Sequence, residues 1–274
     1  MEKKRAGHAP LLLDLRDHSP LEPRMSSFLE FIFVRQRWMR MSMVLGTLWI
    51  VSGCGTVKVL EPAQAAAIKN VGVISLLPTS LVYQKTGITV FNNERAERPV
   101  QTAFNDAGRT GAEAAFRSLK RINVRQLDVN IAEVKELFRP GAIVFSWPPE
   151  KARQFLVLLA KQQGVDAIVT VHEVFDSENG IAGVRYFLRG GLDSIVRHGI
   201  RADTEVSLYD AKGDILVSRS AGLGTLYTVD RPDSKPWVYR LEDNLDAATH
   251  AQVLSSMKRV IETKTFSQVQ ALGL

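Results

Sequence analysis

An uncharged apolar run ends on the only cysteine of the chain. Residues 41–53 read MSMVLGTLWIVSG, and Cys54 follows directly. As a helix this run would extend about 20 Å, whereas crossing a bilayer core takes about 20 residues. A short apolar run with a positive flank, here Arg35, Arg37 and Arg40, followed by small residues is the pattern of a signal peptide. We therefore expect residues 41–53 to be a signal-peptide apolar region outside the folded domain.

The four residues Val51-Ser52-Gly53-Cys54 resemble the lipobox of bacterial lipoproteins. In that family an aliphatic residue lies three positions before the cysteine, and small residues lie just before it. The resemblance implies that signal peptidase recognises Val51, Ser52 and Gly53 and cuts before Cys54. It also implies that Cys54 carries diacylglycerol on its thiol and an acyl chain on its new amino group. Two or more chains anchor a protein far more firmly than one, at about 0.8 kcal/mol per buried methylene.

The residue after the cysteine bears on which membrane holds the protein. Lipoproteins kept in the inner membrane commonly carry Asp there, whereas this chain has Gly55. The resemblance therefore implies the outer membrane, with the protein on its periplasmic face. We expect residues 54–69 to be a lipidated tether. Apart from the lipid on Cys54, we expect no cofactor and no metal.

The stretch before the apolar run is long for the basic region of a leader. Residues 1–40 include a polar, proline-punctuated segment at 1–24. We expect residues 1–40 to be either a disordered extension or an extension ahead of the true start. The methionines available as internal starts are Met25, Met39 and Met41.

The distribution of charge argues against nucleic acid as a partner. Residues 1–40 hold eight Lys/Arg and five Asp/Glu, so they carry +3 of the formal net charge of +6. The other +3 is spread over the residues from Cys54 onward without a long basic run. Nucleic-acid-binding proteins usually show a clustered basic face or a known module. We expect the partners to be the membrane, through the lipid, and a protein or a second copy of the chain.

The mature region, residues 70–274, alternates strand and helix patterns. We expect strands at 71–77, 81–84, 88–91, 123–129, 141–147, 165–174, 181–188, 204–210 and 214–223, and helices at 104–122, 131–138, 150–163 and 247–261. Lys85-Thr86-Gly87 suits a hairpin or a kinked strand pair, and Ala211-Lys212-Gly213 suits a turn. This order predicts a single-domain α/β (α+β) sandwich with a mixed sheet flanked by helices.

The order of elements also resembles the periplasmic domains of the curli-secretion lipoprotein and the penicillin-binding-protein activator lipoproteins. The strand VGVISLL at 71–77, the helix ending before GVDAIVTVHEV, and the strands after it carry this resemblance. It implies an assembly or accessory protein of the cell envelope rather than an enzyme. No residue of that family can be matched position by position.

One short motif suggests an enzyme. Arg197-His198-Gly199 resembles the signature of histidine phosphatases, in which the histidine takes the phosphoryl group and the arginine holds its oxygens. Those enzymes place the motif after the first strand and need a second histidine and more arginines downstream. Here the sole later histidine is His250, on the apolar side of the last predicted helix. We therefore assign no catalytic residue, and a hydrolase is the weakest of the readings.

Other candidate motifs have plainer explanations. His172-Glu173 lacks a second zinc-binding histidine and is expected to face solvent at a strand end. Asp176, Glu178 and Asn179 lack the rest of a calcium loop. The glycines of Gly108-Arg109-Thr110-Gly111 are expected to allow tight packing of a helix on a sheet, because no phosphate-binding lysine follows them.

Two surface groups are candidates for contact with a partner. Glycines punctuate residues 190–199, which we expect to link two strands, and four arginines surround this link: Arg185, Arg189, Arg197 and Arg201. They form either a solvated rim or a contact for an anionic headgroup, glycan or protein. The aromatic residues Tyr227, Trp237 and Tyr239 form either a contact loop or packing at the edge of the core.

Three functions from different classes remain on the sequence alone. The leading one is a non-enzymatic, lipid-anchored periplasmic protein that assembles with or assists envelope machinery. The alternatives are a module that binds a small ligand or glycan and, less favoured, a hydrolase. No convergent set of acid, base and nucleophile is visible in the sequence.

Overall fold

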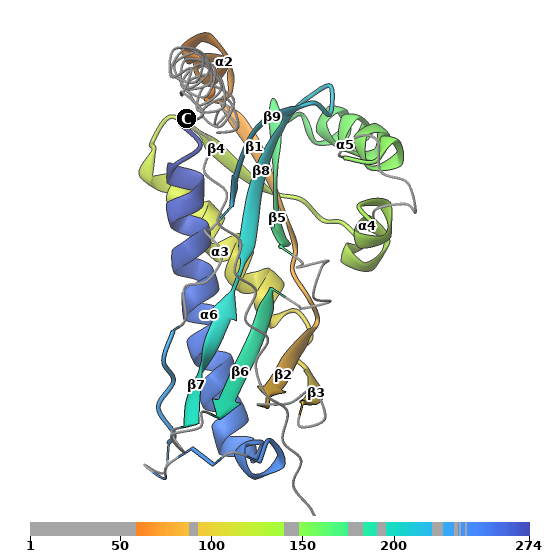
Figure 1. Cartoon of the computed structure of the whole chain (residues 1–274). Helices are drawn as coiled ribbons and strands as arrows, with labels where there is room; N and C mark the ends of the chain where they lie inside the picture. Colours follow the sequence, from red (N-terminus) through yellow and green to blue (C-terminus); the bar gives the residue numbers. More distant parts are fainter. Residues whose placement is uncertain are drawn as a thin grey trace, which may run out of the picture. The chain divides into compact units, whose positions relative to one another are not determined.

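Two mixed β-sheets organise the fold (Figure 1). The computed structural model describes residues 59–274 except 88–92, 140–147, 175–182, 191–195, 221–226, 233–234, 236 and 239. In this part of the chain a five-stranded sheet has the order β4-β1-β5-β8-β9, and a four-stranded sheet has the order β3-β2-β6-β7. The strands are β1 (Asn70–Leu76), β2 (Ser80–Thr86), β3 (Glu94–Pro99), β4 (Asn123–Gln126), β5 (Ala167–Glu173), β6 (Val184–Gly190), β7 (Val196–Ala202), β8 (Thr204–Asp210) and β9 (Ile215–Ser220).

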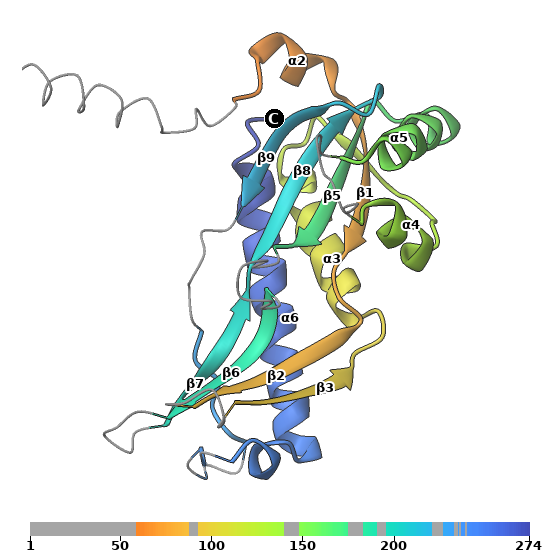
Figure 2. The same cartoon turned by 45° about the vertical axis from the view of Figure 1, so that its right-hand side comes forward.

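Helices cover both faces of the five-stranded sheet (Figures 1 and 2). The helices are α2 (Pro62–Ala67), α3 (Ala103–Ser118), α4 (Ile131–Leu137), α5 (Glu150–Gln163) and α6 (Ala247–Gln270), with a 3₁₀ turn at Glu242–Asn244. One hydrophobic core joins α3 and α6 to one face of the sheet, and a second core joins α4 and α5 to the other face. The predicted α/β class, with mixed sheets flanked by helices, is confirmed. No described helix has both the length and the apolar character that a bilayer-spanning helix needs.

The chain passes from one sheet to the other at two short junctions. Residues 77–79 separate β1 from β2, and Asp203 alone separates β7 from β8. Pro78 has no N–H to continue a ladder. At the other junction the N–H of Asp203 donates to the carbonyl of Gly183 (2.9 Å), and its carbonyl accepts from the N–H of Val174 (2.8 Å). The single sheet that the sequence suggested is therefore divided in two at these junctions.

Most of the predicted helices and strands are present, and capping residues mark the ends of two of the helices. The buried strands expected at 71–77 and 165–174 are β1 and β5. Helix α5 is capped at its C-terminal end by Gly164, whose φ of 58° is the left-handed conformation that favours glycine as a helix stop. Asp246 caps the start of the last helix, because its side chain accepts a hydrogen bond from the N–H of Thr249 (2.7 Å). It runs on to Gln270, nine residues beyond the predicted end at 261.

Two predictions for the four-stranded sheet are wrong, and two predicted strands lie outside the described residues. Lys85 and Thr86 belong to β2 rather than to a turn, and Lys85 pairs across the ladder with Glu94 of β3. The link expected at 190–199 is in part strand, because β7 begins at Val196 and pairs with β6. The strands predicted at 88–91 and 141–147 fall outside the described residues.

The folded core begins ahead of residue 70. Leu60, Ala65 and Ile68 are buried in the core that contains α3 and α6. Proline at the first position of α2 and a capping box between Glu61 and Gln64 support this short helix. Part of the predicted tether is thus packed on the domain, while the predicted boundaries within residues 1–58 remain predictions.

Helices α3 and α6 approach closely because α3 presents small residues to its partner. Ala107, Gly111 and Ala115 recur every four residues on the buried side of α3. A Cβ added at Gly111 would lie 2.4 Å from the backbone oxygen of Glu262 in α6. A Cβ added at Gly108 would lie 2.7 Å from the hydroxyl of Ser75 in β1. The tight packing predicted for these glycines is confirmed, against a helix at Gly111 and against the sheet at Gly108.

Candidate functional site: an arginine face on the four-stranded sheet

The four arginines singled out in the sequence lie on adjacent strands in matched positions. In the antiparallel pairing of β6 with β7, Arg185 lies opposite Arg201 and Arg189 lies opposite Arg197. Residues four apart on a strand share a face, so all four side chains leave the same face of the sheet. We call this set of four residues the arginine face. The structure therefore brings together residues that the sequence only showed as neighbours of a link.

The arginine face is the side of the sheet that turns away from α6. The intervening residues Tyr186, Leu188 and Ile200 project from the opposite side and are buried in the core with α6. Figure 2 shows α6 passing behind β6, β7 and β2, with the outer face of these strands toward the viewer. Phe187 lies between Arg185 and Arg189 on the outer face and is half-buried. The Phe187 side chain thus lies between the pair Arg185 and Arg201 and the pair Arg189 and Arg197.

The four arginines differ in how far they reach solvent. Arg189 and Arg197 are exposed, and Arg201 is half-buried. Arg185 is only 6% exposed, and its charge opposes the rise in the pKa of Glu173 that burial causes. Glu173 also accepts a hydrogen bond from the N–H of Val184 (2.7 Å). Arg185 therefore sits beside a buried carboxyl group, and the surface available to a partner consists of the other three arginines.

The cross-strand register places arginine opposite arginine twice in this face. Like charges opposite each other on a sheet, with Cβ atoms about 5 Å apart, destabilise the pair. An anion placed between them removes the repulsion, and the planar guanidinium is suited to paired hydrogen bonds with a carboxylate or phosphate. Arg189 and Arg197 therefore place two guanidinium groups on one face of the sheet, and Arg201 adds a third cation further along β7.

The aromatic residues of the predicted contact loop are packed rather than displayed. Trp237 stacks on His198 (centroids 4.4 Å apart) and on Tyr186 (5.2 Å), and its Nε1 donates to the carbonyl of Val229 (3.2 Å). Tyr227 pairs with Ile200 in an isolated antiparallel bridge. Tyr239 lies outside the described residues. For Trp237 the structure supports the packing alternative.

The Arg-His-Gly motif does not form a phosphate-handling pair. Arg197 and His198 are consecutive on β7, so their side chains leave opposite faces of the sheet. His198 faces Trp237 on the inner side, while Arg197 belongs to the arginine face. His250 is occupied elsewhere, because its Nδ1 lies 2.6 Å from the hydroxyl of Tyr83. The two residues are neighbours in the sequence, but on β7 their side chains lie on opposite faces of the sheet and cannot hold the same phosphate.

His172 and Glu173 do not face solvent as expected. His172 is half-buried on the face of the five-stranded sheet that carries α4 and α5, and its Nε2 lies 3.3 Å from Glu205. Ser207 donates to Glu205 (3.1 Å) and bonds Ser218 (2.7 Å), so polar groups of β5, β8 and β9 are linked. The hydroxyl of Ser207 thus pairs with a carboxylate and another hydroxyl rather than with an imidazole base.

We did not predict this polar network from the sequence, although the alternation of side chains along a strand would have placed some of its members on one face. In TEVSLYD, Glu205 and Ser207 are two apart and share a face, and Ser218 lies opposite Ser207 in β9. Asp176, Glu178 and Asn179, which lack the rest of a calcium loop, lie outside the described residues. Among the residues that are described, no three His, Cys, Asp or Glu side chains are grouped to hold a metal ion.

Burial of the inner-face histidines predicts a pH effect on stability. Desolvation lowers the pKa of His198 against the opposing charge of Asp230, and it lowers the pKa of His250 together with Arg98. The unfolded chain then binds these protons more readily than the folded chain does. Their contribution to the free energy of unfolding is therefore complete above about pH 6.5 and is lost as the pH falls below it.

Titration of the imidazole C–H signals by NMR checks this directly. We expect His198 and His250 to titrate at lower pH in the folded protein than in the same protein unfolded in urea. Equal or higher pKa values in the folded protein would contradict the burial that the structure shows.

Comparison with known proteins gives little for this chain. No family model matches it, and no curated protein matches it. Among solved structures, the crystal structure of lipoprotein GNA1162 from Neisseria meningitidis was matched at 14% identity and a TM-score of 0.22. The match covers 70% of this chain and 95% of that chain. A TM-score this low does not establish a common fold, and the resemblance to curli-secretion and activator lipoproteins stays a prediction.

Proposed function

We propose that the chain is a non-enzymatic, lipid-anchored protein of the bacterial envelope that binds an acidic surface of a partner protein through its arginine face. Cys54 would carry the lipid, on the periplasmic side of the outer membrane. The observation that carries the proposal is the direct cross-strand opposition of Arg189 and Arg197 on an outward sheet face. A protein that offers such a surface to a partner, without a catalytic site, would act in assembly or as an accessory component.

The chemistry of the face favours a protein partner with carboxylates. Arginine is enriched where protein interfaces bury their strongest contacts, and its fork matches a carboxylate in two parallel hydrogen bonds. Phe187 adds an apolar patch among the charges. Complementary charge across such a contact speeds association and selects the partner.

The place of the anchor is compatible with display of the arginine face. Leu60 is the first buried residue in the described part of the chain, and the six residue steps from Cys54 to Leu60 span at most about 20 Å. Figure 1 shows α2 and the four-stranded sheet at opposite ends of α6. Twenty-four residues of helix extend about 36 Å. A lipid on Cys54 would therefore hold the end of the domain that lies away from the arginine face.

Charge reversal of the exposed pair tests the proposal. In the full-length chain, Arg189→Glu with Arg197→Glu would present two carboxylates to an acidic partner. We expect crosslinking in the native envelope to yield at least tenfold less of the partner adduct than the wild type does, because attraction becomes repulsion. The mass of the adduct identifies the partner, and a second copy of this chain would give twice the monomer mass.

The matched control reverses two exposed arginines elsewhere. Arg117 and Arg139 lie in α3 and after α4, and each pairs with a neighbouring glutamate on the surface. Arg117→Glu with Arg139→Glu changes the net charge equally and should leave the adduct intact. An adduct that survives reversal of Arg189 and Arg197, or a wild type that yields none, would contradict the proposal.

A further inference from the structure

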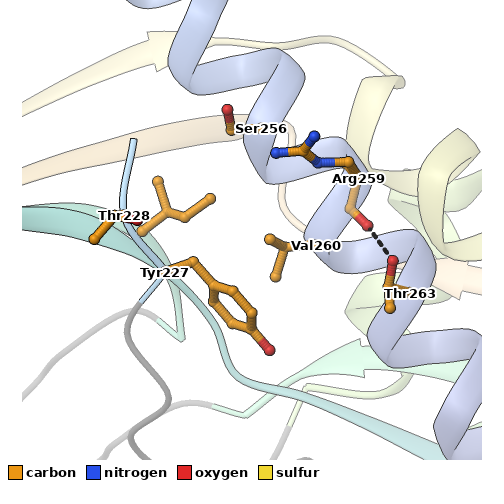
Figure 3. Close-up of a pocket in the computed structure, with 7 residues that line it drawn as sticks. Tyr227, Thr228, Ser256, Arg259, Val260 and Thr263 are labelled. Atoms are coloured by element: carbon orange, nitrogen blue, oxygen red, sulfur yellow. Dashed lines mark hydrogen bonds between the residues drawn. The ribbon is translucent and has the colours of Figure 1, made fainter. Parts of the chain in front are cut away.

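A cavity lies between α6, Ile200 of β7 and residues 227–228, which come after β9 in the chain. It has a volume of about 340 Å³ and is lined by Ile200, Tyr227, Thr228, Ser256, Arg259, Val260 and Thr263. This volume is at the lower end of the 300–1,000 Å³ range of small-molecule sites. Figure 3 shows the ring of Tyr227 on one side and Arg259, Val260 and Thr263 of α6 on the other.

The lining combines an apolar floor with polar side chains. Ile200 and Val260 are buried and supply the floor, together with the Tyr227 ring. Ser256 of α6 is only 7% exposed and brings a hydroxyl group to the lining. A hydroxyl group can both donate a hydrogen bond to a ligand atom and accept one from it.

Arg259 sets the sign of the charge in this cavity. No carboxylate among the described residues lies within ion-pairing distance of it, whereas the nearby Asp203 is matched by Lys264 (Nζ to Oδ1 3.9 Å). Lys264 also lies over the Tyr227 ring, with Nζ 5.3 Å from the centroid. Thr263 donates its hydroxyl to the Arg259 carbonyl (2.9 Å), so its oxygen can still accept a hydrogen bond. A ligand here meets a cation, two hydroxyl groups and an apolar floor.

We propose that this cavity binds a small amphiphilic anion, with a carboxylate or phosphate headgroup at Arg259 and Ser256 and a short apolar body against Ile200, Val260 and the Tyr227 ring. The site is separate from the arginine face. Ile200 leaves the inner side of the four-stranded sheet, and its neighbour Arg201 leaves the outer side. The proposal therefore does not depend on the partner-binding function.

Calorimetric titration of the full-length chain with hexanoate tests the proposal. Hexanoate has one carboxylate and a body short enough for the cavity, and hexanol has the same body without the charge. We expect hexanoate to bind at least tenfold more tightly than hexanol. Arg259→Gln should weaken hexanoate about tenfold, because it removes a charge-assisted hydrogen bond. Hexyl phosphate, titrated in parallel, shows whether a phosphate headgroup is preferred.

Two further variants separate local from general effects. Lys258→Gln removes a charge from the neighbouring residue of α6, which does not line the cavity, and should leave the affinity unchanged. Thr263→Trp places a large ring at an exposed lining position and should abolish binding without disturbing the core. Failure of hexanoate and hexyl phosphate to bind the wild type would overturn the proposal. Equal affinity for hexanol, or binding that survives both Arg259→Gln and Thr263→Trp, would overturn it as well.

Discussion

Replacing Gly111 by alanine should lower the free energy of unfolding by about 2 kcal/mol or more, the cost of overpacking a close contact. Alanine normally stabilises the interior of a helix by about 1 kcal/mol relative to glycine. Here the new Cβ would lie 2.4 Å from the backbone oxygen of Glu262, and backbone cannot rotate aside as a side chain can. Helices α3 and α6 would have to separate along their whole contact. Urea denaturation of the wild type and the variant measures the difference.

Two matched variants show whether the close contact is the cause. Gly108→Ala brings its Cβ to 2.7 Å from the hydroxyl of Ser75, a side chain that can turn away, so a smaller loss is expected. Ala114→Gly, at an exposed position of the same helix, should cost about 1 kcal/mol through helix propensity alone. If Gly111→Ala were as stable as the wild type, the packing of α3 on α6 described above would be incorrect.

Cys54→Ser should abolish lipid attachment completely. The hydroxyl of serine replaces the thiol that the lipoprotein pathway alkylates, and the chain has no other cysteine to take its place. We expect no incorporation of an alkyne-labelled fatty acid and accumulation of a chain that keeps its leader. Ser52→Ala keeps a small residue before the cysteine and should be labelled and processed like the wild type. A Cys54→Ser chain that is labelled as strongly as the wild type would place the lipid elsewhere.

Elements with a one-sided or fully buried pattern were predicted well. The runs that became β1 and β5 are dense in β-branched residues because they lie between two helical layers. The helix before β5 was bounded by proline at its start and glycine at its end. In each of these cases local chemistry and tertiary burial favour the same structure.

Strands of the four-stranded sheet were harder to predict because their sequences contradict the usual pattern. Residues 94–99 read ERAERP and form an edge strand that is almost wholly exposed. Their sequence therefore lacks the apolar residues that mark a buried strand. Arg197, His198 and Gly199 of β7 suggested a linking loop, since glycine and charge are uncommon in strands. Their pairing with β6 supplies what their own propensity lacks.

Only part of the arginine face could be predicted from the sequence. Spacing shows that Arg185 and Arg189 share a face, as do Arg197 and Arg201. The register of β6 against β7, which places the two pairs in direct opposition, depends on long-range pairing. The cavity beside Arg259 was not visible at all, because its walls come from β7, from residues 227–228 and from α6. Neither the burial of Arg185 nor that of Ser256 could be read from local sequence.

The amino terminus of the wild-type protein, isolated from its native envelope, tests the central claim most directly. In the proposed function, the anchor and the display of the arginine face both depend on cleavage and lipidation at Cys54. Mass spectrometry of the terminal peptide should find a chain that begins at Cys54, with diacylglycerol on the sulfur and an acyl group on the amino nitrogen. A terminus upstream of Cys54 with a free thiol would contradict the account.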